Sequence, residues 1–77
     1  MIMVTPPIVQ KFVGADQFLK DNVKQIAKET EDADDTKQYV EDIIFDYESK
    51  FGILLDNEKP DVVAYINYLI DDLWAKD

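Results

Sequence analysis

The chain has no cysteine, no histidine and no arginine among its 77 residues, and it contains only two glycines and one tryptophan. Without cysteine, neither a disulfide framework nor a thiolate metal site can form, and nothing in the sequence calls for an oxidising compartment. We therefore expect the protein in the cytoplasm. Without histidine and cysteine, it also lacks the most frequent general base and the most reactive nucleophile of enzymes.

Few of the remaining side chains suit catalysis. The only serine, Ser49, falls on the outer face of a predicted helix, with no histidine to activate it. A pair of carboxylates can act as acid and base only if burial raises the pKa of one of them, and every Asp and Glu falls on a polar helix face or in a loop. We expect no enzymatic activity and no cofactor.

Long apolar runs are absent as well. No stretch approaches the length of a membrane span, and the opening MIMVTPPIV lacks the basic residues and long apolar region of a targeting segment. We expect no membrane insertion. A net charge of −9 also opposes direct binding to nucleic acid or to an anionic membrane, because each phosphate contact requires a cation.

The charge is unevenly distributed along the chain. Residues 1–38 contain seven acids and five lysines, a net charge of −2, whereas residues 39–77 contain ten acids and three lysines, a net charge of −7. With 47% hydrophobic residues, the chain is nevertheless too apolar for intrinsic disorder. We expect a single acidic domain over residues 1–77, whose C-terminal half would attract a basic protein surface.

The first periodic segment predicts an amphipathic helix over residues 6–29, with at most a short extended arm over residues 1–5. Thr5 is the expected N-cap, because its side chain can accept from an N–H at the start of the helix. A break at Gly14, with Asp16 capping a second helix, is the alternative; we favour the continuous helix. Its apolar positions recur at steps of three and four: Ile8, Phe12, Ala15, Leu19, Val23 and Ile26.

Two further helices follow, over residues 36–51 and 60–75. Gly52 is placed to end the first of them in a left-handed conformation, and Pro60 suits the first turn of the second. The fold class is therefore all-α, a small three-helix bundle, or four helices if the first breaks at Gly14. The apolar positions are Val40, Ile43, Ile44, Tyr47 and Phe51 in one helix, and Val62, Val63, Ile66, Leu69, Ile70, Leu73 and Trp74 in the other.

Between the first two predicted helices lies the acidic segment ETEDADD, residues 29–35, with five carboxylates in seven positions. We expect Asp34 or Asp35 to cap the following helix. A calcium loop counted from Asp32 would place Lys37 where a glycine is needed and Ile43 where a bidentate acid is needed. We therefore predict no specific metal site.

The sequence EDIIFDYESKFGILLDNE, residues 41–58, resembles the second helix and following loop of acyl carrier proteins, and DVVAYI, residues 61–66, resembles their last helix. This resemblance spans residues 39–70, less than half of the chain, and implies a small acidic helical carrier. Carrier proteins attach their prosthetic group to a serine in an Asp-Ser-Leu motif before the second helix. Here Asp-Asp-Thr-Lys, residues 34–37, stands at that place, so no phosphopantetheine site is predicted.

Two aromatic rings are expected to point away from the core. Phe45 is surrounded by acids on the second predicted helix, and Tyr68 is flanked by acids on the third. An aromatic anchor ringed by charges is typical of a protein-binding surface. The predicted partner-binding residues are Glu41, Asp42, Phe45, Asp46, Glu48, Tyr68, Asp71 and Asp72, together with Glu31 and Asp32 of the acidic segment.

These features favour a small acidic module that binds a basic surface of a partner protein. Its most concrete form is an inhibitor that occupies a nucleic-acid-binding groove, such as that of a nuclease, and presents carboxylates where phosphates would lie. Phage-encoded antagonists of host nucleases and immunity-type antidotes have similar compositions. The alternative is a carrier-like or scaffolding helical module without a prosthetic-group serine.

Overall fold

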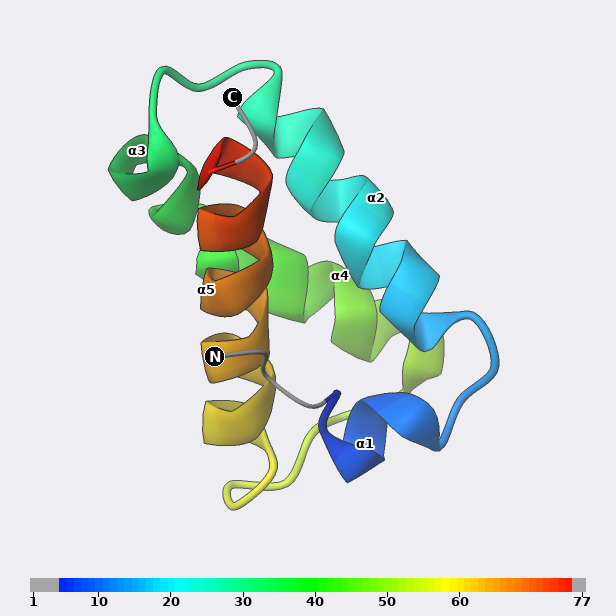
Figure 1. Ribbon diagram of the computed structural model, residues 1–77. Helices are drawn as coiled ribbons and strands as arrows, with labels where there is room; N and C mark the ends of the chain where they lie inside the picture. Colours follow the sequence, from blue (N-terminus) through cyan, green and yellow to red (C-terminus); the bar gives the residue numbers. More distant parts are fainter. Residues whose placement is uncertain (1–4, 76–77) are drawn as a thin grey trace.

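The computed structural model describes residues 5–75, which form five helices and contain no strand. Three longer helices pack together, with α4 behind α2 and α5 in Figure 1, while the short α1 and α3 lie at opposite ends of the bundle. The predicted all-α bundle is confirmed; residues 1–4 of the expected arm lie outside the described residues. The helices are α1 Pro7–Gln10, α2 Ala15–Ala27, α3 Ala33–Lys37, α4 Val40–Phe51 and α5 Lys59–Ala75.

The helix is interrupted between Gln10 and Ala15, so the prediction of one continuous helix over residues 6–29 is wrong. The alternative of a break at Gly14 is correct, except for its cap at Asp16. Gly14 has φ +83° and ψ −5°, a left-handed conformation that glycine adopts without the steric penalty of a side chain. The break turns α1 beneath the bundle, where Val9 is buried (Figure 1). The expected caps are not used: Pro6 and Gly14 occupy the N-cap positions, and neither Thr5 nor Asp16 caps a helix.

The segment predicted as one helix over residues 36–51 is likewise two helices. α3 begins before it, and a tight turn through Gln38 and Tyr39 separates α3 from α4. This turn rotates Thr36 away from the axis of α4 and toward α5, where its side chain is fully buried. Gly52 ends α4 as expected, but with φ 122° and ψ 159° rather than in the left-handed region. The third predicted helix is confirmed as α5.

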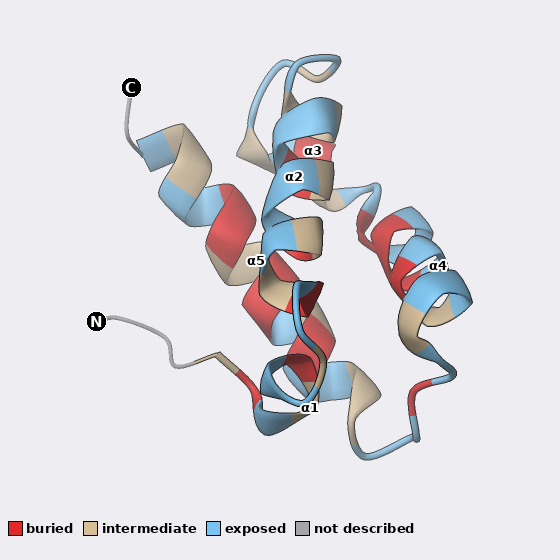
Figure 2. Cartoon of the chain, turned by 90° about the vertical axis from the view of Figure 1, so that its right-hand side faces the viewer, coloured by how far each residue is buried: buried red, intermediate tan, exposed pale blue. Residues whose placement is uncertain are grey.

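The core lies between the facing sides of α2, α4 and α5. In Figure 2 the buried residues of α5 form a stripe along the helix, and those of α4 lie on the side that faces the other helices. Full burial of such aliphatic side chains stabilises the fold by about 1.5 to 3 kcal/mol each. The buried apolar residues are Val9, Ala15, Leu19, Val23, Val40, Ile43, Ile44, Tyr47, Leu54, Val62, Tyr65, Ile66, Leu69 and Ile70.

Rings from three parts of the chain close the lower end of the core. Phe51, the last residue of α4, has its ring centroid 5.6 Å from that of Phe12, 5.4 Å from Phe18 and 5.0 Å from Tyr47. Tyr47 is fully buried, and its hydroxyl donates to the carbonyl of Ile8 at 3.3 Å. The cluster therefore attaches both α1 and the start of α2 to the end of α4.

A buried hydroxyl joins α3 to the C-terminal part of α5. The Oγ1 of Thr36 accepts from Nε1 of Trp74 at 3.0 Å, donates to the carbonyl of Asp32 at 2.9 Å, and lies 2.7 Å from Oγ1 of Thr30. A hydroxyl has one donor and two acceptor positions, so these three partners satisfy it. Because an unsatisfied buried polar group is costly, this bonding favours one orientation of α3.

A second polar group links α2 to α5. The hydroxyl of Tyr65 donates to Asp16 and accepts from Thr5, and Asp16 forms an ion pair with Lys20 at 3.0 Å. Partial burial alone would raise the pKa of Asp16, but the hydrogen bond from Tyr65 and the neighbouring Lys20 outweigh it and lower that pKa below its usual value. Burial and the bond to Asp16 raise the pKa of Tyr65. Asp16, expected as a cap, instead fastens two helices.

Replacement of Gly14 tests the break between α1 and α2. A Cβ built at Gly14 meets no atom within 4 Å, so Gly14→Ala changes only the backbone energy. We expect it to lower the free energy of unfolding by about 1 to 2 kcal/mol, because alanine is strained in the left-handed conformation. In a continuous helix the same change would instead stabilise the protein by about 1 kcal/mol. Urea unfolding measures whether the free energy of unfolding falls or rises, with Ser49→Ala as the control.

The linkage through Asp16 predicts how stability depends on pH. The pKa of Asp16 is lower in the folded state than its unfolded value of 3.8. The contribution of Asp16 to stability is therefore fully present above pH 3.8 and is lost as the pH falls through the folded-state pKa. We expect Asp16→Asn to be less stable than the parent at pH 7, with a difference that shrinks as the solution is acidified. Urea unfolding at several pH values measures it, with Asp46→Asn as the control. A difference that stays constant with pH would contradict this assignment.

Candidate functional site

The outer side of α4 combines an exposed aromatic ring with exposed carboxylates. Phe45 is 69% exposed, and Glu41, Asp42 and Asp46 beside it are exposed. These four residues are called the acidic face below. The helical period creates it, because the buried residues Val40, Ile43, Ile44 and Tyr47 share the side of α4 that faces the core and leave these positions on the opposite side (Figure 2). The prediction that Phe45 points outward among acids is confirmed.

The backbone beneath the acidic face is firmly held. Ile43, Ile44 and Tyr47 on the inner side of α4 are at most 1% exposed, so the helix cannot roll without exposing them to water. In the loop after α4, the N–H of Leu54 donates to Oε2 of Glu48 at 2.8 Å. Glu48 therefore closes the following loop and is only half-exposed, although it was predicted to contact a partner.

The acids predicted on α5 have other surroundings. Asp71 forms an ion pair with Lys37 at 2.8 Å, which joins α5 to the end of α3. Asp72 is exposed and lies in a groove beside α2. The outer side of α4 faces away from α2 and α5 (Figure 1), so Asp72 does not extend the acidic face.

The second predicted ring does not stand free of the core. Tyr68 is only partly exposed and packs against the buried cluster. It stacks on Tyr65, with ring centroids 6.2 Å apart and planes inclined by 20°. The expectation that Tyr68 points away from the core is therefore wrong, and Phe45 is the exposed anchor of the two.

Two carboxylates of the acidic segment accept hydrogen bonds from its own backbone. Asp32, not Asp34 or Asp35 as expected, is the N-cap of α3, and its Oδ1 accepts from the N–H of Asp35 at 2.8 Å. Asp35 in turn accepts from the N–H of Glu31 at 3.2 Å. The cap lies nearer the N-terminus than predicted because the helix starts at Ala33, which brings Thr36 to α5. The carboxylates of Asp32 and Asp35 thus hold the segment together. Glu31 takes part through its backbone N–H, and both Glu31 and Asp32 are exposed.

Within residues 5–75, no group of three or more acidic side chains is arranged to hold a metal ion. The carboxylates of the acidic segment are spread along a loop and a single helical turn, and two of them are used in backbone capping. The segment therefore gives the protein exposed negative charge and a helix start.

Two features of the surface were missed by sequence reasoning. Ile53 and Leu55 are 82% and 62% exposed on either side of buried Leu54, an alternation after Gly52 that could have indicated an extended loop. The other is the spacing of Lys20, Lys24 and Lys28, which recur every four residues along α2 and share one side of it. That side borders the groove between α2 and α5.

Comparison with protein-family models, with curated proteins and with solved structures found no match for this chain. Among the residues that the structure describes, no helix is both long enough and apolar enough to cross a membrane.

The cap of α3 is open to a direct test. Asp32→Ala should lower the free energy of unfolding by about 1 kcal/mol. Asp32→Asn should keep most of the stability that the cap contributes, because asparagine caps as well as aspartate. Glu29→Ala, an exposed acid of the same segment, should change stability by less than about 0.5 kcal/mol. Urea unfolding compares the three. Equal effects of Asp32→Ala and Glu29→Ala would show that Asp32 is not needed as the cap.

Proposed function

We propose that the protein is a small acidic binding module that docks on a basic surface of a partner protein through the acidic face of α4. One observation carries the proposal: the large ring of Phe45, 69% exposed, stands among three exposed carboxylates on a helix whose other side is buried. Aromatic anchors surrounded by polar groups are typical of the centres of protein interfaces.

The ring and the carboxylates have separate tasks in such an interface. A phenylalanine that enters a pocket removes a large apolar area from water and slows dissociation. Carboxylates at the rim attract a positively charged surface over a distance and raise the association rate. The net charge of −9 adds to this attraction for any basic partner.

In its most specific form, the proposal is that the module inhibits a nucleic-acid-binding protein by occupying its basic groove. Carboxylates at positions three and four apart on a helix lie about 5 to 6 Å from each other, so Asp42 and Asp46 present a row of negative charge. A groove that neutralises phosphates with lysine and arginine can accept such a row in their place. The phenylalanine would then distinguish this partner from other basic proteins.

The carrier alternative gains no support from the residue at the attachment position. Thr36 stands closest to the place of the carrier serine, and its hydroxyl is fully buried and bonded to Trp74 and Asp32. A prosthetic arm attached there would require α3 to detach from α5. This observation favours a module that acts by surface contact.

The proposal predicts two separable effects on binding. We expect the immobilised protein to capture a basic protein from a cell lysate at low salt and to lose it at high salt, because screening beyond about 8 Å removes the electrostatic attraction.

With the captured protein purified, Asp42→Lys and Asp46→Lys should slow association. Phe45→Ala should mainly speed dissociation, at a cost of about 2 kcal/mol if the ring is a hot spot. Surface plasmon resonance separates the two rates.

Matched variants elsewhere provide the controls. Asp56→Lys makes the same charge change in the loop after α4 and should slow association less than Asp42→Lys does. Ile53→Ala removes another exposed apolar side chain and should leave dissociation unchanged. Duplex or single-stranded nucleic acid should compete with the module for its partner. A partner that binds nucleic acid and the module together, without mutual effect, would rule out mimicry. Retention of full affinity by both Phe45→Ala and Asp42→Lys would remove the acidic face from the interface.

A further inference from the structure

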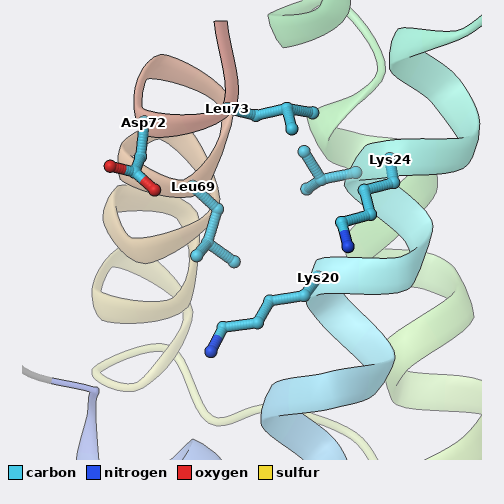
Figure 3. Close-up of a pocket in the computed structure, with 6 residues that line it drawn as sticks. Lys20, Lys24, Leu69, Asp72 and Leu73 are labelled. Atoms are coloured by element: carbon cyan, nitrogen blue, oxygen red, sulfur yellow. The ribbon is translucent and has the colours of Figure 1, made fainter. Parts of the chain in front are cut away.

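A groove runs between α2 and α5, away from the acidic face. It consists of two adjoining hollows with volumes of about 210 and 320 Å³, which share Lys24 and Leu73 in their walls. Figure 3 shows Lys20 and Lys24 extending from α2 at the groove, and Leu69 and Leu73 projecting into it from α5. One wall is therefore basic and the other apolar.

The basic wall is a row of lysines in a protein with few cations. Lys20, Lys24 and Lys28 are each one step of four residues apart, about 6 Å along the helix, so the row is about 12 Å long. Lys20 is paired with Asp16 at 3.0 Å. Lys24 and Lys28 form no ion pair with any acid in the described residues 5–75. Two of the three charges are thus available to a ligand.

The apolar wall and floor have fixed positions. Val23 and Leu69 belong to the core, and Leu73 packs against it. Trp74 forms the far end of the groove, and the bond from its Nε1 to Thr36 holds the indole in one orientation. Asp72 lines the α5 side, and its carboxylate is directed away from α2 (Figure 3). The α2 edge of the groove is therefore the basic one.

We propose that this groove binds an amphipathic helix with an acidic edge, supplied by a second partner protein. Apolar side chains of that helix would pack on Leu69, Leu73 and Trp74, as in other helix-in-groove complexes. Acids spaced four residues apart would lie opposite Lys24 and Lys28, because their spacing along a helix equals that of the lysines. The lysine row sets the orientation of the bound helix, with its acidic edge against α2.

Two other occupants suit the groove less well. An anionic membrane presents a broad surface, which would bring many acids of a chain of net charge −9 close to its headgroups, whereas a helix contacts the groove alone. A second copy of this chain offers the acidic face of α4, but the one apolar side chain of that face, Phe45, cannot cover a wall formed by Leu69, Leu73 and Trp74. A separate helix provides both the charge and the apolar surface.

The test uses the full chain and a synthetic helical peptide of about four turns, with leucines along one face and glutamates every fourth residue along one edge. Trp74 is the only tryptophan and lines the groove, so its fluorescence reports occupation directly. We expect a saturable change with this peptide and none with the same peptide carrying lysines in place of the glutamates. Amide NMR shifts should map the peptide to α2 and α5.

Charge-reversal variants distinguish peptide binding in the groove from an effect of the net charge of the protein. Lys24→Glu with Lys28→Glu should weaken peptide binding by about tenfold or more, since two attractions become repulsions. Lys11→Glu with Lys59→Glu changes the net charge equally but lies outside the groove, and it should have a much smaller effect. Leu73→Ala should also weaken binding, with circular dichroism confirming that the fold is kept. Asp42→Lys should leave the peptide affinity within about twofold, which separates this proposal from the function proposed for α4.

Three results would overturn the proposal. One is equal weakening by the two lysine pairs, and another is the absence of saturable peptide binding. The third is evidence for another occupant: concentration-dependent self-association that Lys24→Glu abolishes would indicate a second copy, and a Trp74 response to oleate but not to the peptide would indicate an anionic amphiphile.

Discussion

Burial of one small apolar core is the constraint on which the rest of this structure depends. The chain has no cysteine with which to cross-link itself, so the facing sides of α2, α4 and α5 must supply most of the favourable free energy of folding. Ile43, Ile66 and Ile70 are completely buried, one from α4 and two from α5. In so small a domain each such side chain contributes a large share of the net stability. The core also determines which side of every helix is left for function.

Apolar contact does not by itself choose a single arrangement of short helices, and here polar bonds supply that choice. Thr36 fixes α3 against Trp74, and Tyr65 fixes the start of α2 through Asp16. In both cases the polar atoms are partly or wholly removed from water, so an incorrect packing would leave them without partners. Hydrogen bonds of this kind add little to the total stability but discriminate strongly between alternative packings.

Helical periodicity predicted the parts of the fold that depend on local spacing. The buried sides of α2, α4 and α5 were identified because apolar residues recur with the helical period on each of them. Leu19, Ile44 and Ile66 are examples, one from each helix. The same reasoning placed Phe45 correctly, since it lies opposite the apolar side of α4. The break at Gly14 was the less favoured alternative, because apolar spacing continues in phase across it, and the break after Lys37 was not predicted.

The remaining errors concern properties set by neighbours distant in sequence. Tyr68 was expected to be an outward ring, but its exposure depends on Tyr65, on which it stacks. Any of the five carboxylates of the acidic segment could have served as the cap, and Asp32 was selected by the position of α3 on α5. The sequence contains the donors and acceptors for these contacts, but their pairing is decided only when the helices pack.

The placement of opposite charges suggests how two binding surfaces can coexist on one small domain. Both fields are screened over the same Debye length of about 8 Å, but the net charge of −9 makes the field negative around most of the molecule, and the lysine row on α2 reverses it only locally. A basic partner would therefore be attracted from most directions toward the acidic face. An acidic helix would be opposed by the net charge and would depend on contact with Leu73 and Trp74 to remain bound. Association at the acidic face should thus be governed by charge, and retention in the groove by apolar burial. The core makes this separation possible, because it lies between α4 and the other two helices and keeps the two surfaces on different sides of the molecule.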